Sequence, residues 1–285
     1  MKETRYYQVA EHAFSVTGEE GIFALMGNYE PFCVGSNQIV FSLTITDDKA
    51  PVYIEELRQN DEGQTIVCGR TADGHPVYEY RRQNKMVGWL ICSNDYSEGR
   101  LVMVGPHAKM VLNNALMMLY SLSTADKGTA LFHSAVVSYC GKGYMFLGKS
   151  GTGKSTHAAL WLRYITGSEL MNDDNPVVRV INGKSFVYGS PWSGKTPCYR
   201  NVSCELGGIV QLSQAPYNKI RRLSGVESYA VLMPSISGKR WDKRVADGLH
   251  QSENTLAKTV PTWYLECLPD EAAALLCKEK ICDDR

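Results

Sequence analysis

Residues 144–162 read YMFLGKSGTGKSTHAALWL, and this stretch decides how the second half of the chain folds. Gly148, Gly153, Lys154 and Ser155 satisfy the pattern G-x-x-x-x-G-K-[ST] without a mismatch. An apolar run precedes the loop, and apolar residues at helical spacing follow it. Strand, glycine-rich loop and helix in this order predict an α/β domain that binds phosphate groups.

The chemistry of the loop gives each part of it a task. Glycines allow tight turns that point successive N–H groups toward a polyphosphate, and the start of the helix adds partial positive charge. We expect Lys154 to bridge the β and γ phosphates and the Ser155 hydroxyl to bind Mg²⁺. With ATP and Mg²⁺ as cofactors, the predicted nucleotide-binding residues of the loop are Gly148, Lys149, Ser150, Gly151, Thr152, Gly153, Lys154, Ser155 and Thr156.

Two carboxylates follow the predicted helix. The helix is expected to end near Gly167, and residues 168–172 predict a short strand that delivers Asp173 and Asp174 to its carboxyl end. Ligands of α/β sheets bind at that end of the strands. One carboxylate there can hold the Mg²⁺ of a nucleotide, and its neighbour can accept the proton of an attacking hydroxyl. Asp-Asp-Asn-Pro is also typical of a turn, so a functional role for the two aspartates is favoured only because the glycine-rich loop precedes them.

A third segment, residues 188–196, combines small residues, an aromatic ring and a lysine in one loop. Lys195 is a candidate phosphate contact. Trp192 is a candidate wall of the acceptor site, with a packed tryptophan in a structural turn as the alternative. Arg200 is a candidate for stabilising charge on the transferring phosphoryl group, with an ordinary surface arginine as the alternative.

One histidine and the cysteines complete the set of reactive side chains. His133 starts a strand that we expect beside the phosphate-loop strand, and from the residues alone a buried, hydrogen-bonded imidazole is the simpler interpretation. The other histidines show no metal-ligand spacing. The nine cysteines form no C-x-x-C pair and their number is odd, so we expect reduced thiols.

The first part of the chain follows a different pattern. Short β-rich runs, such as residues 38–46 and 76–80, are separated by turns rich in Asp, Gly and Asn. A proline then initiates a run with helical spacing. We therefore predict a mainly antiparallel β-rich region at 1–105, a connecting helix at 106–127 and a nucleotide-binding domain at 128–285.

Composition limits the classes of function. Lys+Arg 30 balance Asp+Glu 30, and this balance argues against a nucleic-acid partner. No apolar stretch approaches the roughly 20 residues that span a bilayer, and the amino terminus lacks the apolar core of a signal peptide. We expect a cytoplasmic protein with no nucleic-acid and no membrane partner, and we leave homo-oligomerisation open.

Three segments together resemble the catalytic domain of HPr kinase/phosphorylase and its relatives in the PEP carboxykinase-like P-loop group. They are residues 131–137, the loop 148–155 and Asn172-Asp-Asp-Asn175. The resemblance covers about residues 128–276, and residues 260–270 also look like the end of such chains. It implies an α/β (α+β) nucleotide-binding domain of the HPr-kinase-like type, preceded by the smaller β-rich region.

The resemblance also implies an activity and assigns roles. It implies an ATP- and Mg²⁺-dependent kinase that transfers the γ-phosphoryl group to a hydroxyl, with serine of a protein, a peptide or free serine as the favoured acceptor. It implies that Lys154 and Ser155 hold phosphate and metal, that Asp173 is the catalytic base and Asp174 a metal ligand, and that His133 lies near the reacting phosphate.

The chain departs from that family in two ways. The acidic metal-binding signature that HPr kinase carries after the aspartate pair is replaced here by residues 189–200, which argues against HPr itself as the acceptor. The chain is far shorter than a PEP carboxykinase, which argues against decarboxylation. The alternative function is a regulatory or scaffold protein that binds a nucleotide and transfers nothing.

Overall fold

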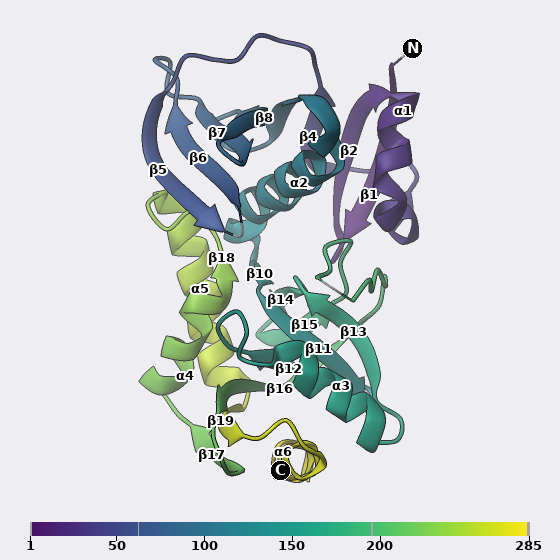
Figure 1. The fold of residues 1–285 in the computed structure, drawn as a ribbon, viewed down its shortest axis with the longest axis vertical. Coiled ribbons are helices and arrows are strands. Elements are labelled where there is room, and N and C mark those ends of the chain that lie inside the picture. Colours follow the sequence, from purple (N-terminus) through teal and green to yellow (C-terminus); the bar gives the residue numbers. More distant parts are fainter. Residues whose placement is uncertain (1, 62, 195, 284–285) are drawn as a thin grey trace. The chain divides into compact units, whose positions relative to one another are not determined.

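The structure, a computed structural model, describes residues 2–61, 63–194 and 196–283. The chain divides into two compact units, Met1–Thr124 and Ala125–Arg285, each with its own large β-sheet (Figure 1). Helices pack on both sheets, so the protein belongs to the mixed α/β class that the sequence predicts.

Over its described residues, the first unit contains a nine-stranded sheet in the order β3-β1-β2-β4-β9-β8-β7-β6-β5. Neighbouring strands run antiparallel, except that β4 runs parallel to β2 and to β9. The expected alternation of burial is seen in β4, where Phe41 and Leu43 are buried. The strands are β1 (Lys2–Val9), β2 (His12–Glu19), β3 (Cys33–Val34), β4 (Ile39–Ile45), β5 (Ile54–Asp61), β6 (Gln64–Arg70), β7 (Pro76–Arg82), β8 (Lys85–Cys92) and β9 (Glu98–Met103), and the short helix α1 spans Glu20–Phe23.

Helix α2 (Ala108–Thr124) belongs to the first unit. It packs against β4, β8 and β9, and its apolar residues at helical spacing are buried. Gly88 permits this close packing, because a Cβ atom there would lie 2.7 Å from Cγ1 of Val111. Tyr120 ties the helix to β1 by donating a hydrogen bond to the carbonyl oxygen of Val9 at 3.0 Å. The sequence predicts a connecting helix at 106–127, whereas the buried face of α2 makes it part of the first unit's core.

The second unit is built on a mixed sheet in the order β13-β11-β12-β16-β15-β14-β10-β18, extended by β19 on β16 and β17 on β19. The strands are β10 (Thr129–Phe132), β11 (Ser134–Tyr139), β12 (Lys142–Leu147), β13 (Glu169–Asp174), β14 (Val177–Ile181), β15 (Lys184–Tyr188), β16 (Ser203–Gln214), β17 (Lys219–Leu223), β18 (Ile236–Ser237) and β19 (Thr262–Cys267). The helices are α3 (Lys154–Tyr164), α4 (Val226–Leu232), α5 (Lys243–Thr259) and α6 (Glu271–Asp283).

Strand direction brings four strand ends to one edge of this sheet. β12, β16 and β19 are parallel neighbours. β13 runs the same way, because β12 and β13 both pair antiparallel with β11. The carboxyl ends of β13, β12, β16 and β19 therefore share an edge, which is where ligands of α/β sheets bind.

The core of the second unit lies between this sheet and helices α3 and α6. Trp161 of α3 is fully buried and packs against the rings of Tyr144 and Phe146 on β12. Leu265 of β19 and Cys277 of α6 belong to the same buried cluster. This packing fixes α3 against the strand that precedes it in the sequence.

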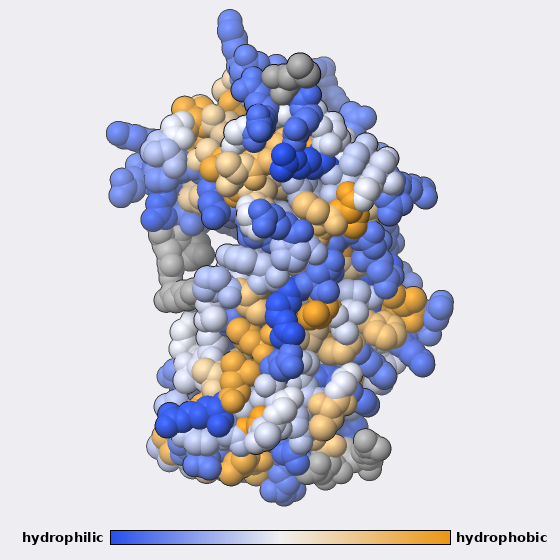
Figure 2. Space-filling model, turned by 90° about the vertical axis from the view of Figure 1, so that its right-hand side faces the viewer, coloured by the Kyte–Doolittle hydropathy of each residue, from blue (hydrophilic) through white to orange (hydrophobic). Residues whose placement is uncertain are grey.

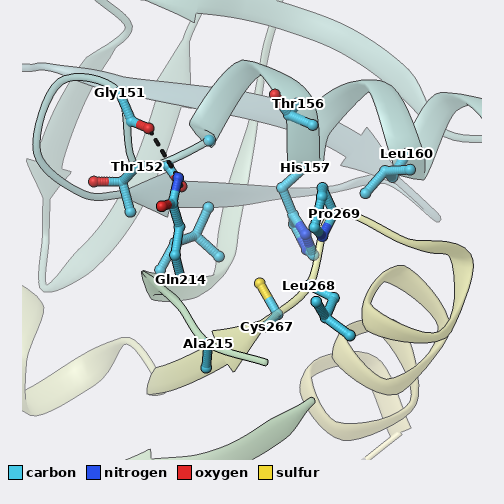
Figure 3. Close-up of a pocket in the computed structure, with 12 residues that line it drawn as sticks. Gly151, Thr152, Thr156, His157, Leu160, Gln214, Ala215, Cys267, Leu268 and Pro269 are labelled. Carbon is cyan, nitrogen blue, oxygen red and sulfur yellow. Dashed lines mark hydrogen bonds between the residues drawn. The ribbon is translucent and has the colours of Figure 1, made fainter. Parts of the chain in front are cut away.

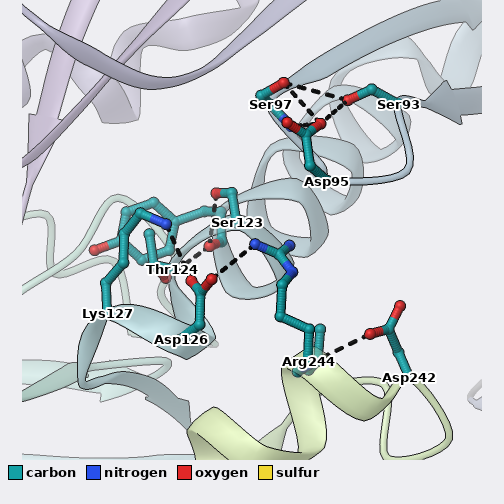
Figure 4. A network of polar contacts seen from close by, with 11 residues as sticks. Ser93, Asp95, Ser97, Ser123, Thr124, Asp126, Lys127, Asp242 and Arg244 are labelled. Carbon is teal, nitrogen blue, oxygen red and sulfur yellow. Dashed lines mark hydrogen bonds and ion pairs between the residues drawn. The ribbon is translucent and has the colours of Figure 1, made fainter.

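Two turns are held by carboxylates (Figure 4). In the first unit, Asp95 accepts hydrogen bonds from the hydroxyls of Ser93 and Ser97, and these bonds lower the pKa of its carboxyl to about 2. In the second unit, Asp126 forms ion pairs with Lys127 at 3.0 Å and with Arg244 of α5 at 2.9 Å.

The surface mixes charged and apolar side chains, as Figure 2 shows for one face. Across the part of the chain that the structure describes, no helix combines the length and the apolar composition needed to cross a bilayer.

We predict that Leu265→Ala destabilises the second unit by about 2–5 kcal/mol, because it leaves a cavity among fully buried side chains. Leu275→Ala on α6 is the matched control, because Leu275 is exposed, and its effect should stay near about 0.5 kcal/mol. Urea unfolding followed by tryptophan fluorescence measures both, since Trp161, Trp192, Trp241 and Trp263 lie in this unit. Equal effects of the two changes would contradict the assigned core.

Candidate functional site

The glycine-rich loop joins β12 to α3, as the sequence predicts. Gly153 immediately before the helix has a φ of +108°, a conformation that favours glycine. At Gly148 a Cβ atom would lie 3.0 Å from Cβ of Thr152, so the loop closes tightly on itself only with glycine there. The N–H of Thr152 donates to the carbonyl oxygen of Lys149 at 3.1 Å and completes the turn.

Lys154 is the first residue of α3, and its side chain reaches back to the main chain of the loop. Its side chain is buried, and Nζ donates hydrogen bonds to the carbonyl oxygens of Gly148 at 3.0 Å and Lys149 at 3.4 Å. Burial lowers the pKa of the ammonium group, and the negative charges of Asp174 and Asp173 oppose this shift. The structure thus brings together the lysine and the two aspartates that the sequence singles out.

The first turn of α3 adds positive potential at the same place. The N-cap residue is Gly153, which has no side chain to accept a hydrogen bond from the N–H groups of the first turn. Ser155 and Thr156 lie in this turn and are exposed. An uncapped helix start beside a lysine ammonium is a favourable site for an anion.

The two aspartates differ in their surroundings. Asp173 is 3% exposed, and its Oδ2 has no hydrogen-bond partner among the described residues. Asp174 is more exposed, and its Oδ1 pairs with Nδ1 of His133 at 3.0 Å, while its Oδ2 accepts a hydrogen bond from Asn175 at 2.7 Å. The φ of Asp174 is +142°, a strained value for a residue with a side chain. Such strain is typical of functional sites, where the surrounding contacts maintain it.

Asn172 holds the aspartate pair in place. Its side chain is fully buried, and Nδ2 donates to the hydroxyl of Ser190 and to the carbonyl oxygen of Trp192, both at 3.2 Å. Its Oδ1 accepts from the N–H of Asn175 at 2.9 Å. These bonds fasten the turn after β13 to the loop that follows β15.

The same loop also contacts the aspartates directly. The N–H of Gly194 donates to the carbonyl oxygen of Asp173 at 2.6 Å, and the Ser193 hydroxyl donates to the same oxygen at 3.2 Å. A Cβ atom at Gly194 would lie 3.0 Å from Cβ of Asp174, so only glycine fits without displacement. Sequence reasoning missed Asn172, Ser190, Ser193 and Gly194 as support; a buried-strand asparagine next to paired aspartates was the available signal.

Three further residues predicted from this region have different outcomes. Trp192 is buried, which agrees with the packed tryptophan offered as the alternative. Lys195 lies outside the described residues. Arg200 is not brought to the loop: its guanidinium donates to the carbonyl oxygen of Leu170 and to the carboxylate of Glu169, both at 2.7 Å. Those residues begin β13, whereas Asp173 and Asp174 end it, so the attraction of Glu169 holds Arg200 at the opposite end of the strand.

A metal ion would need help from a bound phosphate at this site. Within the described residues there is no cluster of three or more His, Cys, Asp or Glu side chains that could hold a metal ion. Mg²⁺ differs from most metals in this respect, because it is usually bound by one or two carboxylates together with substrate phosphates and water. The partly exposed Asp174 and the exposed hydroxyl of Ser155 are oxygen donors of that kind.

A cavity of about 660 Å³ lies beside the loop, at the ends of β16 and β19 (Figure 3). Gln214 and His157 stand on opposite sides of it, and Ala215 and Cys267 lie at its base. The amide of Gln214 donates to the carbonyl oxygen of Gly151 at 3.2 Å and so links this wall to the loop. The sequence does not predict this cavity, because its lining beyond the loop comes from three distant segments.

His157 is a neutral imidazole in the wall of this cavity. Burial lowers its pKa to about 4. Its Nε2 accepts a hydrogen bond from Nε1 of Trp161 at 3.2 Å, and its ring packs edge-on against Phe146 at a centroid distance of 4.8 Å. Because Nε2 is the acceptor, the proton of the neutral ring is on Nδ1, which is buried and has no hydrogen-bond partner among the described residues.

We predict a pH dependence of stability from His157. Its folded-state pKa of about 4 lies below the ordinary 6.5, so the unfolded chain takes up a proton first as the pH falls. The free energy of unfolding should therefore lose about 3 kcal/mol between roughly pH 6.5 and 4. Urea unfolding across this range should show that His157→Phe removes this part of the pH dependence of the unfolding free energy. The variant also loses the acceptor of the Trp161 hydrogen bond, which changes stability at every pH and leaves the slope unaffected. An unchanged slope in the variant would contradict the prediction.

Comparisons with known proteins leave the family open. No protein-family model matches the sequence, and no curated protein matches it. Among solved structures, the Hpr(Ser) kinase/phosphatase from Coxiella burnetii aligns with a TM-score of 0.32 and 10% sequence identity, over 54% of this chain and 95% of that chain. A likeness at this level assigns neither a family nor a function to the chain.

Proposed function

We propose that the second unit is an ATP- and Mg²⁺-dependent kinase that transfers the γ-phosphoryl group of ATP to a hydroxyl. The observation that carries the proposal is the meeting of Lys154, the uncapped start of α3 and two aspartates at one edge of the sheet. A kinase with a phosphate-binding loop needs such groups in one place, because phosphoryl transfer from ATP depends chiefly on positioning and on stabilising charge.

The triphosphate is bound by the loop and the helix start in this proposal. Lys154 and the N–H groups of the first turn of α3 bind phosphate oxygens, with the loop residues from Gly148 to Thr156 wrapped around them. Asp174 and the Ser155 hydroxyl would hold Mg²⁺ together with phosphate, and the ion would supply positive charge that offsets the charge of the phosphates. The contact between Nδ1 of His133 and Oδ1 of Asp174 at 3.0 Å keeps that carboxylate in a fixed orientation.

Asp173 is the proposed catalytic base. Its Oδ2 accepts the proton of the acceptor hydroxyl, while the hydroxyl oxygen forms a bond to the γ-phosphorus and the bond to the β,γ-bridging oxygen breaks, which releases ADP. The unpartnered Oδ2 supports this role, because a buried carboxylate oxygen without a partner is costly and has capacity for a proton. The favoured acceptor is serine in a protein, a peptide or the free amino acid, and the first unit is the proposed selector of that acceptor.

The binding part of the proposal is tested by calorimetric titration of the full chain with ATP, with and without Mg²⁺. We predict Mg²⁺-dependent binding that Lys154→Ala reduces by at least tenfold, about 1.4 kcal/mol, because the ammonium contact to phosphate is lost. Lys243→Ala on α5 is the matched control, since that lysine is exposed and distant in sequence from the loop. No binding by the wild type would refute the proposed function.

The transfer part is tested by ATP consumption with serine-containing acceptors. We predict that Asp173→Asn lowers turnover by about 10²–10⁴-fold, the usual contribution of a general base, while ATP affinity changes little. Asp247→Asn on α5 removes an exposed carboxylate and should leave turnover unchanged. Retained activity in Asp173→Asn would refute the base. ATP binding without transfer to any serine, peptide or inorganic phosphate would favour a regulatory or scaffold protein instead.

A further inference from the structure

The cavity beside the phosphate loop is placed where the nucleoside part of a nucleotide must lie. Its lining begins with Gly151, Thr152 and Gly153 of the loop and continues along α3 from Thr156 to Leu160. These two helix positions are one turn apart, about 6 Å along the axis. A group joined to a phosphate in the loop through a ribose therefore reaches this cavity without leaving the carboxyl edge of the sheet.

The lining suits a flat, mostly apolar ring. Leu160, Leu212, Leu268 and Pro269 supply apolar surface, and Leu268 is 38% exposed despite its place at the rim. Exposed apolar surface that borders a cavity next to a polar loop is stabilised when a ring covers it. The volume of about 660 Å³ lies within the range of small-molecule sites.

The wall also contains the ring of His157, which lines the cavity while its Nδ1–H stays buried. This ring therefore adds surface to the lining rather than a hydrogen bond that a ligand can reach. A purine offers a larger flat surface to such a lining than a pyrimidine does.

A neighbouring hollow is less suited to a base. It has a volume of about 500 Å³, and a larger share of its lining is polar than in the cavity, with groups from Lys149, Ser150, Gln211 and Ser213. Gln214 lines both spaces and bonds to the loop through Gly151, so it separates the polar hollow from the apolar cavity. The apolar cavity is thus the better match for an aromatic ring.

We propose that the cavity formed by α3 and the ends of β16 and β19 binds the purine base of a nucleoside triphosphate whose phosphates occupy the loop. This inference rests on the proposed nucleotide binding and adds the place where the base binds and the residues that contact it. Leu160 and Leu268 cover the ring, the His157 ring lines the cavity beside them, and Gln214 forms the wall toward the phosphates.

Calorimetry on the full chain with Mg²⁺ tests the inference with three probes: ATP, CTP and inorganic tripolyphosphate. We expect the wild type to bind ATP at least tenfold more tightly than tripolyphosphate or CTP, because only the purine fills the cavity. Equal affinities for ATP and tripolyphosphate would overturn the base site while leaving phosphate binding by the loop intact. Binding of neither probe would overturn both the base site and the proposed function.

Two variants locate the effect. Ala215→Trp places a ring in the cavity and should reduce ATP affinity to that of tripolyphosphate, whose own affinity should not change. Retained tripolyphosphate binding shows that the variant is folded. Leu268→Ala removes one cover of the ring at an exposed position and should weaken ATP severalfold, again without effect on tripolyphosphate.

The control variant adds the same ring elsewhere. Val226→Trp on α4 changes a side chain that is 83% exposed and does not line the cavity, so the affinity for ATP should equal that of the wild type. If Ala215→Trp and Leu268→Ala both keep wild-type affinity for ATP, the base does not bind in this cavity and the inference is wrong.

Discussion

The pairing of β11 with two neighbours is the constraint on which the site depends. Ala135 of β11 pairs with Phe146 of β12 on one side and with Asp173 of β13 on the other. Adjacent strands lie about 4.8 Å apart, so this row places Asp173 about 10 Å across the sheet from Phe146, which is followed by Leu147 and then by the loop. A slip of one residue in the pairing of β13 with β11 would turn the side chain of Asp173 to the opposite face of the sheet. The register therefore decides which face carries this carboxylate.

Charge burial explains why the site needs so many supporting contacts. Lys154 and Asp173 are both buried, and a buried charge is costly unless polar groups surround it. Loop carbonyl oxygens solvate the ammonium of Lys154, while Ser193 and Gly194 bind the main chain of Asp173. Asn172 fixes the turn from within the strand. The loop after β15 thus supports the two aspartates. It has a glycine at position 194 because its main chain comes too close to Asp173 and Asp174 to leave room for a Cβ atom.

The sequence predicts local features of the site well and distant ones poorly. The strand, loop and helix around Gly148 to Ser155 follow from a contiguous pattern, and so does the strand that carries Asp173 and Asp174, because helix and strand periodicities act over few residues. For Arg200 the sequence leaves a catalytic and an ordinary surface role open, because the partner that holds it, Glu169, lies 31 positions away. The cavity was missed for the same reason, since its walls come from α3 and from the ends of β16 and β19.

One edge of the sheet can serve both halves of a nucleotide because of how its strands are ordered. β12 ends at the phosphate loop, and its parallel neighbours β16 and β19 end at the apolar cavity. β13 ends on the other side of β12 with the two aspartates. Phosphates bound by the loop would then lie between a base on one side and the carboxylates on the other. In the proposed reaction the acceptor hydroxyl would approach from the side of Asp173, so the acceptor and the base would be selected at different places along a single row of strand ends.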